Sequence, residues 1–376
     1  MDRKFIEKLG VSLPRLGYGC MRLPEKEGTI DFEYAKKLIH HAYNQGVNYF
    51  DTAYNYHGGE SETFLGQVLK DFDRESYFLT SKLPVWKVKE EKDAEKLFNE
   101  QLQKCNTEYF DFYLLHSLNK RSIETVEKFN LYDFIAKKKA EGKIKHIGFS
   151  FHDNNDVLKK FAAAHEWDFI QLQINYWDWE VDDAKSLYET LEKLNIPCFV
   201  MEPVRGGFLA SFAPHAMKRF KDHNPNASIA SWALRWVGSL PNVALILSGM
   251  SDMDQLKDNI ETFTNLKTIN PDEQKIIHQV VEDLKKINPV PCTSCRYCMD
   301  CEFGVNIPKV FEIYNDYKKS ENKAIANRSY FTFMKEEQQG GNCQQCGVCI
   351  PKCPQHINIP EELGKIHEEM LSIRSN

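Results

Sequence analysis

The sequence lacks the long apolar runs, the basic surplus and the apolar leader that several protein classes require. No apolar run approaches the roughly 18 residues of a membrane-crossing helix. Lys and Arg number 48 against 54 Asp and Glu, and the net charge of −6 provides no basic surface for nucleic acid. The start, MDRKFIEKLG, is charged and has no apolar core, unlike a secretory signal. We therefore expect a cytoplasmic protein without a membrane or nucleic-acid partner.

A glycine-rich nucleotide fingerprint is also missing. An open, doubly wound sheet that binds a dinucleotide normally carries G-x-G-x-x-G after its first strand, and GYGC at 17–20 does not match. No flavin motif is legible. These absences weigh against the doubly wound sheet as the fold of the first 260 residues.

Cysteine, in contrast, is concentrated near the C-terminus, where two runs hold eight of the eleven cysteines. The runs comprise Cys292, Cys295, Cys298 and Cys301, then Cys343, Cys346, Cys349 and Cys353. They form an internal repeat, since CEFGVNIP and CPQHINIP both reach Asn-Ile-Pro at the same distance from the fourth cysteine. Three thiolates spaced two residues apart can wrap one face of an iron–sulfur cube. The runs therefore predict metal clusters.

Zinc and disulfides are the competing interpretations. Four-cysteine zinc sites favour two separate CxxC pairs divided by a longer spacer, and a third cysteine in one run suits a tetrahedral ion poorly. Disulfides are unfavourable in the reducing compartment that the composition indicates. The pattern favours iron–sulfur clusters, and the second run fits best.

Before the cysteine runs, short apolar segments rich in Val, Ile, Phe and Tyr alternate with segments of helical period. Residues 3–12 predict a hairpin turning near Gly10. The predicted strands are 15–20, 47–51, 76–82, 109–115, 144–149, 168–173, 196–200 and 243–247. The predicted helices are 31–45, 61–70, 92–105, 121–142, 154–165, 182–195, 227–238 and 252–264. Eight strand–helix units favour a closed (β/α)8 TIM barrel.

The strand–helix alternation ends near residue 265. Residues 272–287 predict one more helix, and Pro289 and Pro291 mark a boundary before the first cysteine run. A polar, helical spacer near 309–340 separates the two runs. We therefore predict a barrel domain over 1–285 and a small, mostly helical iron–sulfur domain over 286–376.

The predicted strand ends supply a second test, because a barrel places its active site at the carboxyl ends of its strands. Those ends carry Asp51, Lys82, His116, Ser150, Gln171, the segment 201–207, and Ser248 with Gly249. Each such residue alone is commonly a cap, a solvated side chain or a structural histidine. Found together on consecutive strands, they indicate a catalytic site.

These residues resemble the aldo-keto reductase family. The resemblance spans most of 10–264 and rests on FDTAYNY, LTSK, FYLLH, IGFS and SGMSDMDQLKDNI. It implies that Tyr56 is the catalytic acid and that Asp51, Lys82 and His116 complete a tetrad. The implied reaction is hydride transfer between a nicotinamide coenzyme and a small aldehyde, ketone or alcohol.

The chemistry of the four side chains suits these roles. A phenol with a pKa near ~10 is a poor proton donor at neutral pH, and a buried ammonium beside it would bring that pKa toward neutrality. Asp51 would keep Lys82 charged, and His116 would hydrogen-bond the carbonyl oxygen. Tyr54 competes with Tyr56 for the acid role, and only the resemblance separates the two.

The resemblance also implies coenzyme contacts. Ser150, Gln171 and Asn175 would meet the carboxamide, and Arg205, Gly206 and Gly207 would lie along the pyrophosphate. The loop from Ser248 to Asn259 would hold the adenosine end. Basic residues that many relatives place there appear as Gly249 and Gln255, so NAD(H) and NADP(H) both stay open.

A branch of the same family resembles this chain in carrying a C-terminal ferredoxin-like extension. By analogy with two-cluster ferredoxins, Cys353 would complete the set of Cys292, Cys295 and Cys298, and Cys301 would complete the other, giving two [4Fe-4S] clusters. The first run departs from that pattern, because two residues rather than three precede Cys301 and Glu302 replaces a proline.

The two halves differ in the number of electrons they move. Hydride transfer moves two electrons together, whereas a cubane cluster moves one. The clusters of a carbonyl reductase would therefore exchange electrons with a redox partner protein, serve as structural cross-links or sense oxygen. The alternative function is an iron–sulfur electron-transfer or interaction protein whose barrel no longer performs hydride chemistry.

Overall fold

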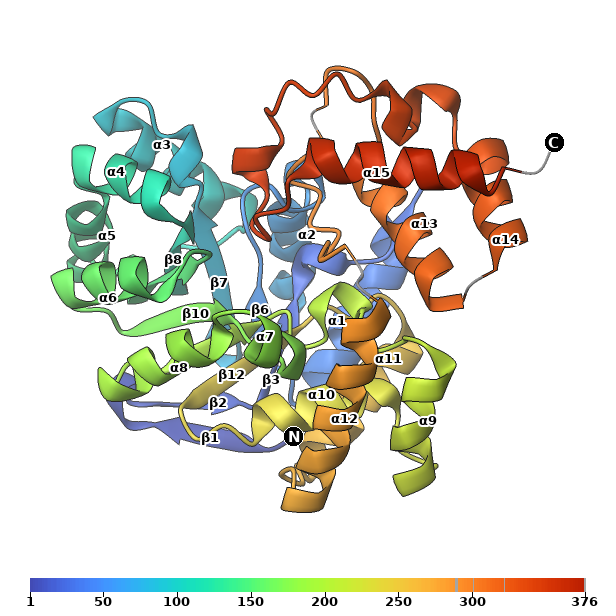
Figure 1. Cartoon of the computed structure of the whole chain (residues 1–376). Helices are drawn as coiled ribbons and strands as arrows, with labels where there is room; N and C mark the ends of the chain where they lie inside the picture. The colour runs from blue at the N-terminus through green and yellow to red at the C-terminus, as the bar shows by residue number, and fades with distance from the viewer. Residues whose placement is uncertain (288–289, 300, 321, 375–376) are drawn as a thin grey trace. The chain divides into compact units, whose positions relative to one another are not determined.

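A computed structural model describes residues 1–287, 290–299, 301–320 and 322–374, and it contains a closed barrel of parallel strands (Figure 1). The barrel strands are β3 (Leu16–Gly19), β6 (Tyr49–Asp51), β7 (Phe78–Leu83), β8 (Phe110–Leu118), β9 (Ile144–Phe151), β10 (Phe169–Gln173), β11 (Cys198–Met201) and β12 (Val243–Ser248). Each strand pairs with the next along the chain, and β12 pairs with β3 to close the ring. The eight predicted strands and the (β/α)8 barrel are confirmed.

An aromatic layer fills the interior of the barrel. Phe169 and Phe199 have ring centroids 4.4 Å apart, and Phe112 lies 5.3 Å and 5.4 Å from them. Such pairs contribute about 0.5–1.5 kcal/mol each beyond the apolar area they bury. The antiparallel strands β1 (Arg3–Ile6) and β2 (Val11–Pro14) pack against this layer, with Gly10 left-handed between them at φ 65°. The predicted hairpin is confirmed.

Helices follow the barrel strands, as the strand–helix alternation predicts. They are α1 (Phe32–Asn44), α2 (Ser61–Val68), α3 (Glu91–Lys104), α4 (Lys120–Lys128), α5 (Leu131–Ala140), α6 (Asn155–Ala164), α7 (Tyr176–Val181), α8 (Ala184–Lys193), α10 (Ile229–Gly238) and α11 (Met253–Thr264). A short hairpin of β4 (Glu25–Lys26) and β5 (Thr29–Ile30) precedes α1. Asp31 and Asp252 cap α1 and α11 through Tyr34 N–H and Gln255 N–H. Helix propensity and capping therefore agree with the tertiary fold.

One predicted helix is wrong in its extent. The sequence suggested a continuous helix over 121–142, but the chain breaks between α4 and α5 at Asn130, which is left-handed at φ 49°. Asn tolerates this conformation better than most residues with a Cβ atom. The short helix α7 was not predicted at all.

The chain forms two compact units, and each is described by itself. The first comprises Met1–Pro203 with Ala230–Asn270, and the second comprises Val204–Ile229 with Pro271–Asn376. The second unit contains α9 (Pro214–His223), α12 (Pro271–Ile287), α13 (Ile307–Ser320), α14 (Lys323–Asn327) and α15 (Ile359–Ser372). Its core holds Val305, Phe311, Tyr330 and Leu363, and the cysteine runs pack against that core.

This division differs from the boundary predicted at residues 285 and 286, which falls within α12. The segment after β11 belongs to the second unit because α9 packs on α12, where Arg219 Nε donates to Asp283 Oδ2 at 2.6 Å. Pro289, expected at the boundary, lies outside the described residues.

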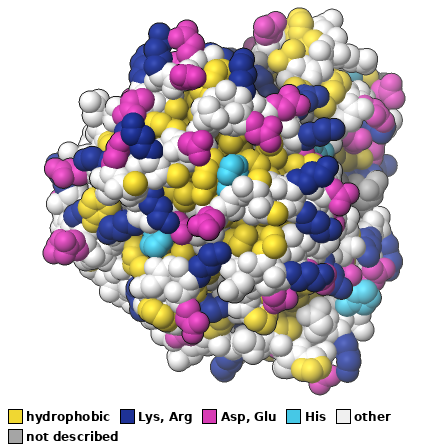
Figure 2. All heavy atoms as spheres, turned by 90° about the vertical axis from the view of Figure 1, so that its left-hand side faces the viewer, with side chains coloured by type: hydrophobic (Ala, Val, Ile, Leu, Met, Phe, Trp, Pro, Cys, Tyr) yellow, Lys and Arg dark blue, Asp and Glu magenta, His cyan; other side chains and the backbone are white. Residues whose placement is uncertain are grey.

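Charged side chains cover the outward faces of the barrel helices. Figure 2 shows Lys and Arg interspersed with Asp and Glu over the side on which α3–α6 lie in Figure 1. Within the described ranges, no helix combines the length and apolar character needed to span a bilayer.

Candidate functional site

Three of the predicted catalytic residues meet at the carboxyl ends of β6 and β7. Lys82 Nζ lies 2.7 Å from Asp51 Oδ1, 2.7 Å from the carbonyl oxygen of Thr52 and 3.3 Å from the hydroxyl oxygen of Tyr56. The Lys82 side chain has no exposed surface, and Asp51 and Tyr56 are also buried. A single ammonium therefore contacts both the carboxylate and the phenol.

His116, the fourth predicted catalytic residue, packs its ring against the phenol of Tyr56. It belongs to β8, and its ring centroid is 6.0 Å from that of Tyr56 in an edge-to-face arrangement. Burial lowers the pKa of His116 well below 6.5, and the charge of Lys82 lowers it further. Trp86, 41% exposed, packs its ring 5.1 Å from the imidazole. The four predicted catalytic residues are thus close together, with an apolar ring beside them.

The ion pair of Asp51 and Lys82 opposes a strong effect of burial. Burial raises the pKa of Asp51 and lowers the pKa of Lys82, while their contact at 2.7 Å favours the charged form of each. Removing one partner would leave the other charge buried and uncompensated, which typically costs several kcal/mol.

We expect Asp51→Asn to lower the free energy of unfolding of the full chain by about 3 kcal/mol. The control is Asp111→Asn, because Asp111 is also buried but pairs with Arg74 and Lys145, whose side chains reach water. Urea denaturation followed by circular dichroism measures both variants. Equal losses would contradict the special role of the buried Lys82.

Burial raises the pKa of Tyr56 well above 10, and the negative charges of Asp51 and Glu202 raise it further. Burial thus shifts this pKa in the direction opposite to the one expected from Lys82, whose ammonium lies 3.3 Å from the phenol oxygen. Tyr56 is a protonated phenol at neutral pH.

Tyr54, the competing acid, is placed differently. Its hydroxyl donates to Glu100 at 3.2 Å, and its ring lies 4.2 Å from Lys104 Nζ. The structure thus separates two tyrosines that the sequence alone could not, and the ammonium of Lys82 contacts Tyr56.

The residues expected at the nicotinamide carboxamide lie at the ends of β9 and β10. Ser150 and Gln171 are partners in the register of these strands, and Ser150 Oγ accepts from Ser117 N–H at 2.7 Å. A hydroxyl beside an amide offers the donors and acceptors that a carboxamide needs. Asn175 instead caps α7, accepting from Asp178 N–H at 2.8 Å and donating to Asp178 Oδ2 at 2.7 Å.

The loop after β12 is held by its own hydrogen bonds. Asn259 Nδ2 donates to Ser248 Oγ at 3.0 Å, and Gln255 Nε2 donates to Asp252 Oδ2 at 2.7 Å. At Gly249, an added Cβ would lie 3.0 Å from the Cβ of Arg22. The side chain of Arg22 therefore covers the position where the sequence lacks a basic residue.

Sequence reasoning missed two charged groups near the tetrad, Arg22 and Glu62. Arg22 Nη2 pairs with Glu202 Oε1 at 3.0 Å, where Glu202 is left-handed at φ 54°. The fully buried Glu62 accepts from Ser81 Oγ at 2.5 Å. Arg22 and Glu202 follow strands β3 and β11, so the rule that examines strand ends could have found them.

Arg205, Gly206 and Gly207 belong to the second unit, where the backbone of Gly206 lies against Thr293 in the first cysteine run. A Cβ added to Gly206 would lie 2.6 Å from the carbonyl oxygen of Thr293. Their expected place along the pyrophosphate stays a prediction.

The cysteines form two sets that do not follow the two runs in sequence. Burial raises the pKa of Cys298, and the neighbouring charges that raise it further come from Cys295, Cys292 and Cys353. Burial also raises the pKa of Cys349. The neighbouring charges that raise the pKa of Cys349 further come from Cys343, Cys346 and Cys301. The fourth cysteine of each run thus lies with the other run's first three.

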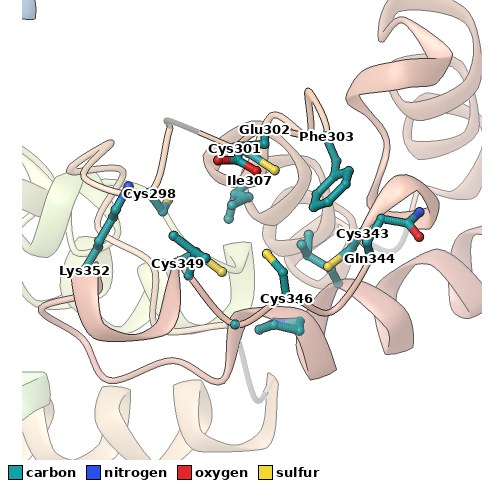
Figure 3. A pocket seen from close by; sticks show the side chains of 14 residues that line it. Cys298, Cys301, Glu302, Phe303, Ile307, Cys343, Gln344, Cys346, Cys349 and Lys352 are labelled. Carbon is teal, nitrogen blue, oxygen red and sulfur yellow. The ribbon is translucent and has the colours of Figure 1, made fainter.

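The second set surrounds one pocket, shown in Figure 3. Five cysteines line this pocket, and the sulfur atoms of four of them, Cys301, Cys343, Cys346 and Cys349, face the same space, while the fifth, Cys298, lies at one side of it. Phe303 and Val348 line the rim and are 41% and 54% exposed. Four thiols around one space are the donor set of a cubane cluster.

A single metal ion would need its ligand side chains closer together than the cysteines of these two sets. In the described ranges, no three His, Cys, Asp or Glu side chains converge closely enough to hold one ion. The irons of a cubane occupy separate corners, so its thiolates stand farther apart than those around one tetrahedral ion.

Comparison with known families gives two matches that together cover most of the chain. Residues 15–282 match the aldo/keto reductase family, and residues 291–364 match the 4Fe-4S dicluster domain.

Individual relatives match between 66% and 76% of the chain. The chain is 25% identical over 304 residues to the uncharacterized oxidoreductase YqkF of Bacillus subtilis, covering 72% of this chain and 94% of the relative. It is 22% identical to L-galactose dehydrogenase of Arabidopsis thaliana, covering 76% and 96%. It is 25% identical to the NADH-specific methylglyoxal reductase of Escherichia coli, covering 66% and 90%.

Among solved structures, the holo form of aldo-keto reductase AKR11C1 from Bacillus halodurans superposes with a TM-score of 0.61. Its sequence identity is 22%, and the superposition covers 74% of this chain and 96% of that one. This likeness concerns the fold.

Proposed function

Because the chain belongs to the aldo/keto reductase family, we propose that it reduces a small aldehyde or ketone to an alcohol, or the reverse, with a nicotinamide coenzyme. The observation that carries this proposal is the contact of buried Lys82 with both Asp51 and Tyr56. A lysine buried only for stability has no need of a phenol beside it.

Each residue of the tetrad has a distinct task. A bound nicotinamide would supply the hydride to the carbonyl carbon. Tyr56 donates its proton to the carbonyl oxygen, and Lys82 stabilises the phenolate that remains. Asp51 holds Lys82 in place, and neutral His116 donates a hydrogen bond to the same oxygen.

Ser150 and Gln171 would hold the carboxamide, and the loop from Ser248 to Asn259 would hold the adenosine end. The relative from E. coli is named for NADH and methylglyoxal, which favours testing small dicarbonyls with both coenzymes. Arg22, which lies over Gly249, offers a positive charge near that loop.

We further propose two [4Fe-4S] clusters. One would be held by Cys292, Cys295, Cys298 and Cys353, and the other by Cys301, Cys343, Cys346 and Cys349. The mutual effects of these cysteines on one another's pKa support this division. When bound, the clusters would supply one-electron chemistry or a structural cross-link.

The test is an assay of the anaerobically purified full chain with a panel of aldehydes and ketones. NADH and NADPH are each supplied, the loss of reduced coenzyme is followed by absorbance, and the alcohol is identified by mass spectrometry. Coenzyme binding without turnover on any carbonyl would instead favour a barrel that has lost hydride chemistry.

The rate of carbonyl reduction is expected to be constant between pH ~7 and pH ~9. Burial keeps the pKa of Tyr56 above 10, so its proton stays on, and it keeps the pKa of His116 below 6.5, so the imidazole stays neutral. The measurement is kcat against pH at saturating substrate. A decline centred near pH ~8 would mean that Lys82 overcomes burial and lowers the pKa of Tyr56.

A further inference from the structure

The segment that follows β11 has an unusual backbone. Arg205, Gly206 and Gly207 have successive φ values of 49°, 63° and 94°, all in the left-handed region. Glycine adopts this region freely, but an arginine there is strained by about 1–3 kcal/mol. Contacts elsewhere must therefore hold Arg205 in this conformation.

Those contacts include the first cysteine run. A Cβ at Gly206 would lie 2.6 Å from Thr293 O and 2.9 Å from Thr293 Cα, which is closer than such atoms can approach. Only glycine allows the two backbones to meet in this way. Thr293 is buried and directly follows Cys292. The segment at Gly206 therefore lies next to Cys292, the first cysteine of the first set.

A second contact ties the same segment to α13. Lys319 Nζ lies 5.4 Å from the ring centroid of Phe208, which is itself buried. The chain before Cys292 is also fixed to α13, because Asn315 accepts from Val290 N–H and donates to Val290 O, both at 2.9 Å. The segment at 205–208 and the chain that leads into the first cysteine run are therefore both held by α13.

Arg205 is a charged residue held almost entirely out of water, with 4% of its surface exposed. Arg205 directly precedes Gly206, whose backbone lies against Thr293, the residue that follows Cys292. Guanidinium stays protonated under all ordinary conditions. A permanent positive charge thus lies beside the first set of thiols.

We propose that Arg205 sets the reduction potential of the cluster held by Cys292, Cys295, Cys298 and Cys353. This inference rests on the proposed ligation. Four thiolates give a cubane a net negative charge, and one electron from a one-electron donor increases that charge by one without requiring a proton. A buried cation stabilises the reduced form more, because low-dielectric surroundings screen it little.

The second cysteine set (Cys301, Cys343, Cys346 and Cys349) is less shielded from water than Arg205 and the first set. Its Cys346 is exposed, and the pocket rim is open to water. Water screens charges near that set, so single cations there have weaker effects. Arg205 would therefore act on one cluster selectively.

The test is an anaerobic redox titration of the full chain, followed by electron paramagnetic resonance. In Arg205→Gln, the ratio of reduced to oxidised first cluster at a fixed potential is expected to fall about tenfold, a shift of about 59 mV for one electron. Arg205→Lys keeps the charge and is expected to titrate like the wild type. Lys319→Gln, which removes a cation of α13 that lies over the ring of Phe208, is the matched control.

An unchanged midpoint in Arg205→Gln, or an equal shift of both clusters, would overturn the assignment of Arg205. If the glutamine variant loses the cluster, Arg205→Lys decides, because a tenfold fall there would exclude a role of charge. A wild type that holds iron but shows no signal from the first set would overturn the ligation itself.

Discussion

Tyr56→Phe is expected to lower the turnover of carbonyl reduction about 10³-fold while leaving the affinity for the nicotinamide coenzyme within about twofold. The substitution removes the hydroxyl oxygen that lies 3.3 Å from Lys82 Nζ, and with it the proton that Tyr56 would donate. The ring remains, so its edge-to-face packing on His116 is kept. Steady-state kinetics measures turnover, and quenching of tryptophan fluorescence measures coenzyme affinity.

The matched control is Tyr54→Phe, which removes a hydroxyl two residues away. That hydroxyl bonds Glu100 on α3 and does not contact the lysine. We expect Tyr54→Phe to keep turnover within about threefold. Equal losses in both variants, or full turnover in Tyr56→Phe, would remove Tyr56 from the role of acid.

Cys301→Ala is expected to reduce the iron content of the anaerobically purified protein from about eight atoms per chain to about four. Cys301 faces the space between Cys343, Cys346 and Cys349, although it lies 42 positions before Cys343 in the sequence. With three thiolates left at a pocket open to solvent, the second cluster would be lost. Iron and sulfide analyses measure the content.

Two further variants make this result specific. Cys353→Ala should also remove about four irons but should spare the other cluster, so the resonance spectra of the two variants should differ. Cys105→Ala, at a buried cysteine of the first unit, should leave all eight. An unchanged iron content in Cys301→Ala, or zinc in place of iron, would contradict the proposed ligand sets.

The Tyr56→Phe and Cys301→Ala predictions concern the two domains of a single chain. The family matches cover an aldo/keto reductase barrel over 15–282 and a 4Fe-4S dicluster domain over 291–364. Two-electron and one-electron chemistry do not combine directly. The reduction potential of the first cluster, which Arg205 is proposed to set, decides whether that cluster can exchange electrons with a physiological carrier.

The sequence by itself determined the barrel and the positions of the tetrad. Strand and helix periods are local properties, so short apolar runs such as 243–247 and caps such as Asp252 could be read directly. Because parallel strands in a barrel end at the same edge, Asp51 and Lys82 could be expected to meet. The repeat of Asn-Ile-Pro likewise indicated paired cysteine motifs.

Only the tertiary structure decided what burial and long-range contacts do to those residues. The protonated state of Tyr56 follows from lost hydration, which no residue pattern measures. The cover of Gly249 by Arg22 joins residues more than 200 positions apart. The contact of Gly206 with Thr293 also depends on the tertiary fold, because a left-handed glycine lets two distant backbones touch.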